Sequence, residues 1–133
     1  MTKNVYYYPA ILQKEDVGYS AWLYDIEGCI SQGDTFEETI ENLKEALGLF
    51  FEDYKENEVQ IPTATDPEKI KLETNQMLVV MEFNWIEYIK KNGKRAIKKT
   101  LTIPAWLNTM AEEKHINFSR ILQSALKEQL NVK

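Results

Sequence analysis

Residues 18–47 read GYSAWLYDIEGCISQGDTFEETIENLKEAL, and this stretch decides the fold. Side chains alternate along YSAWLYDI, which is typical of a β-strand, and both faces of that strand carry apolar groups. A short further strand is predicted at about residues 29–32. Gly33 then permits a tight turn, and Thr35 with Glu38 forms a capping box, which is typical of a helix start.

A long amphipathic helix is predicted from about Phe36 onward. Its apolar positions are spaced by four and three residues, which places on one face Phe36, Ile40, Leu43, Leu47, Phe50 and Tyr54. The other positions are rich in acids. Acids in the first turn suit the positive end of the helix dipole, whereas Glu52, Asp53 and Glu56 lie near its negative end and need another explanation.

The flanking segments complete an α+β pattern. Upstream, residues 4–12 (NVYYYPAIL) predict a strand that forms a hairpin with YSAWLYDI. Downstream, the proline-containing residues 57–75 predict a loop with one helical turn, and residues 77–83 (MLVVMEF) predict a fourth strand. The order βββαβ therefore predicts a domain over residues 1–84, with one helix on one sheet face.

The pattern changes in the last third of the chain. Residues 85–95 are predicted to be a basic linker, and residues 99–103 alternate as a strand does. Pro104 can open a helix that runs to about residue 114. Asn117 can cap a second helix, whose apolar stripe comprises Ile121, Leu122, Ala125, Leu126 and Leu130.

This C-terminal βαα module, residues 96–133, is too small to fold alone. One strand has no sheet partner, and two short helices cannot bury their own apolar stripes. We therefore expect an obligate dimer, in which two copies of the module pair.

The charge is divided unevenly along the chain. Residues 1–89 hold 6 Lys and Arg against 18 Asp and Glu, a net charge of −12, whereas residues 90–133 hold 10 against 3, a net charge of +7. Such asymmetry predicts two modules with different partners. A basic C-terminal module favours a polyanion, and an acidic N-terminal module favours a basic protein.

The composition excludes several functional classes. The 133 residues are too few for a large multidomain enzyme. Cys29 and His115 are the only residues of their types, which excludes an internal disulfide, a Cys-rich zinc site and a His-paired nucleophile. No apolar run reaches the roughly 18–20 residues of a membrane-spanning helix, and MTKNVYYYPA lacks the layout of a signal peptide. We therefore expect a cytoplasmic protein that does not enter the membrane.

The stretch at residues 18–47, with YYPAIL before it, resembles the core of HicB-type antitoxins. The residues that fall in register with that family are Gly28, Cys29, Gly33, Asp34, Thr35 and Asn42. A second stretch, KKTLTIPAWLNTMAEEKHINFSRILQSALKEQL, resembles the ribbon-helix-helix DNA-binding module, through its Leu-x-Ile-Pro strand and the Asn-x-Ser before the second helix.

The resemblance implies both the fold and the partners. It implies a partial ribonuclease-H-like N-terminal domain without catalysis, and a partner that is a HicA-type toxin, a small basic ribonuclease that cleaves mRNA. It also implies that a dimer binds operator DNA and represses the shared operon. With toxin bound, we expect a heterotetramer or a larger assembly.

The ribbon-helix-helix resemblance also predicts a DNA interface. Two paired strands in the major groove would present Lys98, Thr100 and Thr102 to base edges. The free N–H groups at the start of the second helix suit a phosphate, and this position together with the basic segment before the strand predicts the phosphate contacts Asn117, Ser119, Lys99, Arg95 and Lys94. The alternatives are a solvated strand edge, a simple helix cap and a soluble linker.

For the acidic module, we expect acids to oppose a basic toxin surface and aromatic side chains to anchor it. The candidate toxin contacts are Trp22, Tyr24, Asp25, Glu27, Glu52, Asp53 and Glu56. The plainer interpretation is a solvated helix face and a Trp22 that belongs to the core.

Two other functional classes remain open at this stage. One is a stand-alone ribbon-helix-helix repressor whose N-terminal domain senses a small ligand between helix and sheet. The other is a metal-dependent nuclease, which requires several converging carboxylates. Asp25 and Glu27 share a strand end, but residues 4–12 contain no acid to join them. We therefore expect no enzymatic activity, no catalytic or metal-binding residue and no cofactor.

Overall fold

The computed structural model describes residues 3–93 and 96–133. The chain divides into two compact units, Met1–Arg95 (unit 1) and Ala96–Lys133 (unit 2). The elements of unit 1 are β1 (Val5–Lys14), β2 (Tyr19–Leu23), β3 (Ile30–Gly33), α1 (Phe36–Glu56), the 3₁₀ turn η1 (Pro67–Lys69), β4 (Gln76–Asn84) and α2 (Trp85–Asn92). Those of unit 2 are α3 (Ala105–Glu113) and α4 (Phe118–Leu130).

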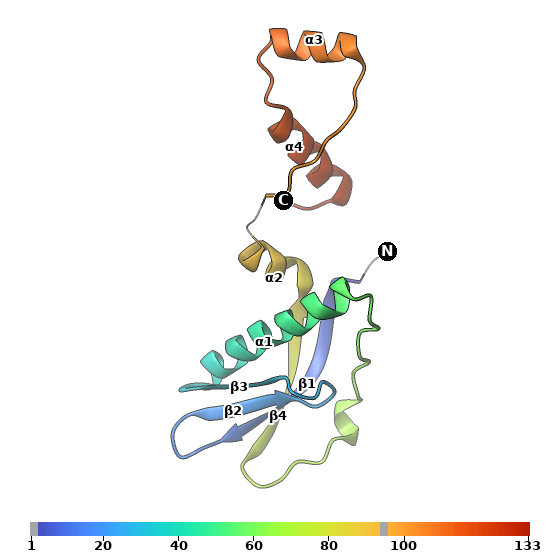
Figure 1. Cartoon of the computed structure of the whole chain (residues 1–133). Helices are drawn as coiled ribbons and strands as arrows, with labels where there is room; N and C mark the ends of the chain where they lie inside the picture. Colours follow the sequence, from blue (N-terminus) through green and yellow to red (C-terminus); the bar gives the residue numbers. More distant parts are fainter. Residues whose placement is uncertain (1–2, 94–95) are drawn as a thin grey trace. The chain divides into compact units, whose positions relative to one another are not determined.

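The four strands of unit 1 form one antiparallel sheet in the order β3-β2-β1-β4, and α1 covers one of its faces (Figure 1). The predicted order βββαβ is therefore confirmed, as is the helical turn in the loop, which is η1. Central strand β1 pairs with β2 on one side and with β4 on the other, so that Ala10 lies between Leu23 and Val79.

The start of α1 follows the predicted capping box. Thr35 has an extended backbone, and its side-chain oxygen accepts a hydrogen bond from the N–H of Glu38 at 3.1 Å. This bond satisfies one of the N–H groups that a helix start leaves free. Asn42 on the second turn donates from its side-chain amide to the carbonyl oxygen of Gln32, which ties α1 to β3.

The buried face of α1 is rotated from the predicted one. The buried residues are Thr39, Leu43, Leu47, Gly48 and Phe51, whereas Phe36 is 54% exposed and Phe50 is only partly buried. The predicted stripe is therefore confirmed at Leu43 and Leu47, partly buried at Ile40, Phe50 and Tyr54, and wrong at Phe36. The reason is packing: Phe51 enters a cluster of aromatic rings, with its ring centre 4.8 Å from those of Tyr6 and Phe83.

Residues 85–92 form helix α2, where the sequence predicts a linker. Asn84 caps this helix by accepting from the N–H of Glu87 at 3.1 Å. Trp85 and Tyr88 stack on each other and pack against the core of unit 1. Tyr88 fits there because Gly48 has no side chain: a Cβ on Gly48 would overlap the Tyr88 ring. Aromatic side chains one helical turn apart thus extend the folded unit beyond residue 84.

In unit 2 the predicted helices are present, but the predicted strand at residues 99–103 is not. Asn117 caps α4 as expected, by accepting from the N–H of Arg120 at 3.0 Å. Residues 96–104 carry no regular secondary structure. A strand requires a neighbouring strand to receive its hydrogen bonds, and unit 2 of a single chain supplies none among its described residues.

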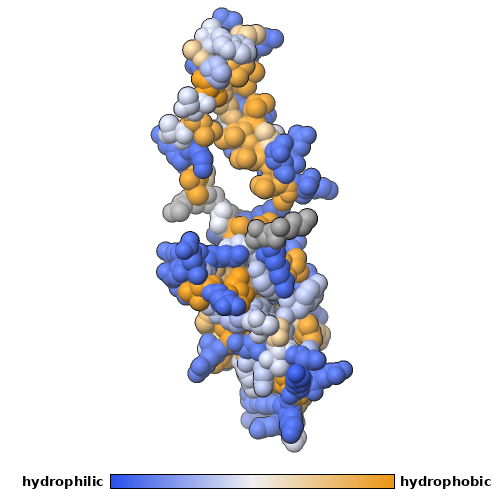
Figure 2. All heavy atoms as spheres, turned by 90° about the vertical axis from the view of Figure 1, so that its right-hand side faces the viewer, coloured by the Kyte–Doolittle hydropathy of each residue, from blue (hydrophilic) through white to orange (hydrophobic). Residues whose placement is uncertain are grey.

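Unit 2 leaves its large apolar side chains uncovered (Figure 2). Those exposed by at least 37% are Ile97, Leu101, Ile103, Trp106, Leu107, Met110, Ile116, Phe118, Ile121, Leu126, Leu130 and Val132. No residue from 96 to 133 is buried. Exposed apolar area on this scale is rare in monomeric proteins.

Candidate protein and nucleic-acid interfaces

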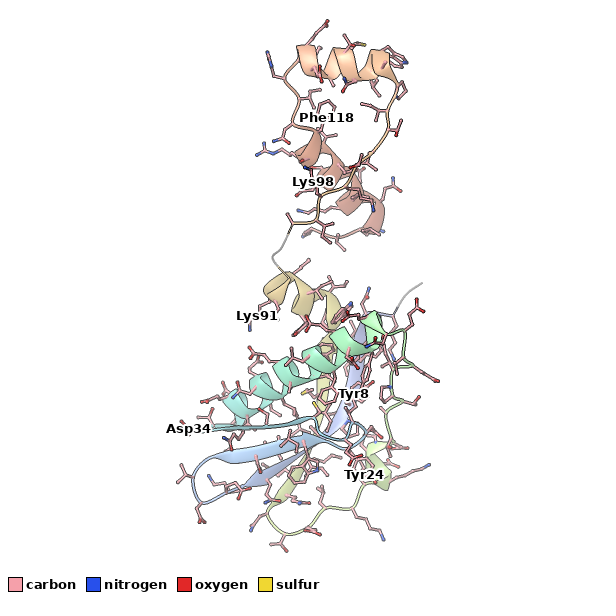
Figure 3. The ribbon with its side chains drawn as sticks, viewed as in Figure 1. Tyr8, Tyr24, Asp34, Lys91, Lys98 and Phe118 are labelled. Atoms are coloured by element: carbon pink, nitrogen blue, oxygen red, sulfur yellow. The ribbon has the colours of Figure 1, made fainter. Side chains whose placement is uncertain are left out.

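Four of the predicted toxin contacts lie together at the end of β2. Trp22, Tyr24, Asp25 and Glu27 line one open groove with the turn that follows them, up to Ile30. Tyr24 is 49% exposed, and Trp22 is partly buried. Figure 3 shows Tyr24 near the segment that carries η1. The groove therefore offers two aromatic side chains next to two acids.

Asp25 has a structural role that the sequence did not reveal. Its carboxylate accepts two hydrogen bonds from Thr65, one from the backbone N–H at 2.9 Å and one from the side-chain hydroxyl. Tyr8 makes a similar connection, since its hydroxyl donates to the carbonyl oxygen of Pro62 at 2.6 Å. The two side chains fasten the segment between α1 and β4 to the sheet, so the oxygens of Asp25 are already engaged.

Burial of Tyr8 produces a testable pH dependence. The ring is 2% exposed, and the pKa of its phenol is raised to about 12. Burial is the main cause, and the electrostatic effects of Tyr54, Tyr6 and Asp25 add to it. The folded state therefore holds the proton more tightly than the unfolded state, whose tyrosines titrate near their ordinary value of about 10. We expect the free energy of unfolding to fall as the pH rises from about 10 to 12, by on the order of 2 kcal/mol from Tyr8.

Urea unfolding at pH 8, 10 and 11.5 measures this effect. Tyr8→Phe should flatten the decline, because the variant has no phenol to titrate at this buried position. Tyr24→Phe is the control, since its ring is half exposed, and it should decline as the unsubstituted chain does. Equal declines in all three proteins would contradict the assignment.

The other three predicted toxin contacts lie on α1, away from the groove. Glu52, Asp53 and Glu56 are exposed near the end of the helix. Asp53 accepts a hydrogen bond from the side-chain amide of Asn57, which follows the helix. The seven predicted residues thus form two groups, one at the end of β2 and one on the helix.

The sheet face opposite α1 carries further exposed apolar residues that the sequence analysis did not select. Tyr7 is 55% exposed, Ile30 62% and Val80 51%. The sequence does carry a signal for them: residues 4–12 and 77–83 are apolar at both alternating positions, which is typical of strands covered on two sides. One side is covered by α1, and on the other side the middle of the face is also buried, since Pro9 and Ile11 are buried and so is Ile70, which directly follows η1.

In unit 2 the predicted base-contacting residues Lys98, Thr100 and Thr102 all lie in the exposed segment before α3. Figure 3 shows Lys98 on this segment. Lys99, a predicted phosphate contact, is exposed beside them. The predicted phosphate contacts Lys94 and Arg95 lie outside the described residues.

The predicted phosphate contacts Asn117 and Ser119 line a shallow polar hollow at the start of α4. The hollow also includes Arg120, Gln123, Ser124 and Lys127. Arg120 and Lys127 are cations that the sequence analysis missed. They lie three and ten residues after the cap, and their placement on one side of α4 with Asn117 makes the hollow suitable for an anion.

The structure also bears on a reactive cysteine, a metal site and a membrane-spanning helix. Cys29 has no exposed area, and burial raises the pKa of its thiol to about 11, which makes it unreactive at neutral pH. Among the residues described, no three His, Cys, Asp or Glu side chains are grouped to hold a metal ion. Over the same residues, no helix has the length and apolar character needed to cross a membrane.

An acidic α+β unit with a groove of aromatic and acidic side chains, joined to a unit whose apolar surface is uncovered, defines a small two-part binding protein. Comparison with known families agrees with the sequence resemblance. A family model described as HicB_like antitoxin of bacterial toxin-antitoxin system matches residues 7–125. The chain belongs to the HicB-like antitoxin family.

Two curated relatives each match a little over a third of the chain. A UPF0150 protein from Synechocystis is 51% identical over 51 residues, which are 38% of this chain and 65% of that protein. The chain thus spans about two thirds of that relative's length. A UPF0150 protein from Helicobacter pylori is 38% identical over 50 residues, or 38% of this chain and 69% of the relative.

Solved structures share the fold over nearly the whole chain. One is from a toxin-antitoxin complex of Streptococcus pneumoniae, with 24% identity, a TM-score of 0.60 and coverage of 94% of this chain and 99% of that one. Another is the Burkholderia pseudomallei antitoxin HicB, with 19% identity, a TM-score of 0.55 and coverage of 94% and 98%. At these identities the likeness concerns the fold alone.

Proposed function

We propose that this chain is an antitoxin that binds a HicA-type ribonuclease toxin and occludes its mRNA-cleaving site. The observation that carries the proposal is the family match, which spans both units of the chain. A further structure of similar fold, with 24% identity and a TM-score of 0.51, is that of a HicA3 and HicB3 toxin-antitoxin complex. The acidic residues 1–89 suit a basic toxin.

Unit 1 is the toxin-binding part in this proposal. We infer that its βββαβ order forms a partial ribonuclease-H-like fold, and we propose that it binds the toxin without catalysis of its own. Neutralisation then works by occupying the toxin's RNA-binding surface.

Unit 2 forms the dimer, as a ribbon-helix-helix module. Two supporting observations come from a single chain: unit 2 exposes twelve large apolar side chains, and residues 96–104 pair with no strand within residues 3–93 and 96–133. In the dimer the two segments pair antiparallel, and the exposed faces of α3 and α4 pack against those of the second copy. Dimerisation thus gives the backbone N–H and C=O groups hydrogen-bond partners and removes the apolar side chains from water.

The dimer binds operator DNA and represses its own operon. The paired segments present Lys98, Thr100 and Thr102 to the major groove, and Asn117 and Ser119 hold a phosphate at the start of α4. Each dimer carries two copies of unit 1, and each copy binds one toxin molecule. The smallest complete complex is therefore a heterotetramer.

The ligand-sensing alternative has little support from the packing of unit 1. Leu43, Leu47 and Phe51 have no exposed area at the interface between α1 and the sheet. The part of this interface that the structure describes is filled by side chains, so a small ligand would have to displace them.

Cleavage of an mRNA by the purified HicA-type toxin tests the proposed function. Addition of this chain in equimolar amount should stop cleavage, because the antitoxin covers the toxin's active site. Bovine serum albumin at the same concentration is the control and should leave cleavage unchanged. Cleavage that continues at a tenfold excess of the chain would contradict the proposal.

A further inference from the structure

The sheet face opposite α1 carries a row of apolar side chains across all four strands. The pairing register sets Ile30 of β3 opposite Trp22 of β2, Trp22 opposite Ile11 of β1, and Ile11 opposite Leu78 of β4. In an antiparallel sheet, residues directly opposite each other point to the same face. The row is therefore continuous from one edge of the sheet to the other.

A second row lies beside the first. Pro9 is opposite Val80, and its carbonyl oxygen accepts from the N–H of Tyr24 at 3.1 Å, so these three residues share the same face. Pro9 and Ile11 in the middle are buried, whereas Ile30, Val80 and Tyr24 around them are 62%, 51% and 49% exposed. The centre of this face is therefore already shielded within the chain, and the part that is open to a partner is the exposed apolar periphery.

Acids lie at both ends of this apolar face. Glu82 lies two residues after Val80 on β4 and pairs with Tyr7 of β1. Glu15 lies at the hairpin end, where it accepts from Ser20 at 2.8 Å and from Gln13 at 3.1 Å, two residues that pair on this face. Glu27 lines the groove next to Trp22. The strand residues of this face include no lysine or arginine.

We propose that this face, defined by Trp22, Tyr24, Ile30 and Val80, is the surface that binds the basic toxin. The inference rests on the proposed function and adds the site of contact. Exposed aromatic and aliphatic side chains with acids beside them fit a basic protein surface, because the apolar side chains anchor the partner while the acids steer and select it. Glu52, Asp53 and Glu56 lie on α1, which covers the other face, and are not part of this surface.

A lysine placed on the face tests the inference. Ile30→Lys sets a positive charge against a basic partner, and Val80→Lys does the same from another strand. Leu49→Lys is the matched control, because Leu49 lies on α1 and is 64% exposed, close to the 62% of Ile30. With the full chain and the purified toxin in a calorimeter, we expect each face variant to bind at least about 30-fold more weakly and the control to bind within twofold.

Three other outcomes overturn the inference. If both face variants bind toxin normally while Glu52→Lys binds weakly, the toxin lies against α1. If the face variants bind toxin normally but have a lower mass in sedimentation without toxin, a second copy of this chain covers the face. If the unsubstituted chain does not bind the toxin, the proposed function itself fails.

Discussion

Phe51→Ala should lower the free energy of unfolding by about 3–5 kcal/mol, the range typical of a large aromatic side chain removed from a core. Phe51 has no exposed area, and its ring contacts those of Tyr6, Phe83 and Trp85. The substitution leaves a cavity at the point where α1, the sheet and α2 meet. Because domains of this size are stable by about 5–15 kcal/mol, much of the stability would be lost. Urea unfolding followed by tryptophan fluorescence measures it.

Phe50→Ala is the matched control for this prediction. Phe50 is adjacent in sequence and partly buried, so its loss should cost clearly less than the loss of Phe51. The comparison also tests which face of α1 is buried, because the apolar spacing alone favours Phe50. A larger cost at Phe50 than at Phe51 would contradict the observed packing.

Combined replacement of Lys98, Thr100 and Thr102 by alanine should weaken binding to the promoter of the chain's own operon at least about 100-fold. Each good contact to a base edge contributes about 1–3 kcal/mol, and about 1.4 kcal/mol corresponds to a tenfold change. All three side chains lie in the exposed segment before α3. Fluorescence anisotropy with a labelled promoter fragment at fixed salt measures the change.

Two controls separate this effect from misfolding or a loss of dimers. Lys114→Ala removes a lysine from the end of α3, outside the proposed DNA interface, and should bind DNA within about twofold of the unsubstituted chain. The triple variant should still sediment as a dimer and still bind toxin. Unchanged promoter affinity in the triple variant would contradict the proposed base contacts.

The local signals in this sequence predict most of unit 1 correctly. The capping box at Thr35 and Glu38 fixes the start of α1, and the alternating strands around Gly18 give the hairpin. These features depend on neighbours only a few residues apart. For the same reason, the sequence alone identifies Asn117 as the cap of α4.

The features that the sequence does not predict depend on distant residues. Helix α2 is stabilised by Tyr88 packing on Gly48, forty residues earlier, whereas the basic residues that follow indicate a linker. Asp25 binds Thr65, again forty residues away, so nothing near it in the sequence indicates that its oxygens are engaged. The alternation at residues 99–103 predicts a strand, but a strand also requires a partner that a single copy of unit 2 does not provide among its described residues.

The most direct test of the central claim is growth rescue by unit 1 alone. The HicA-type toxin is induced in cells that also express residues 1–95, which include α2 because its aromatic side chains belong to the core of unit 1. We predict that growth stops with toxin alone and resumes when residues 1–95 are present, since toxin binding resides in unit 1. Rescue by the full chain but not by this fragment would contradict that assignment, and failure of both to rescue would contradict the antitoxin function.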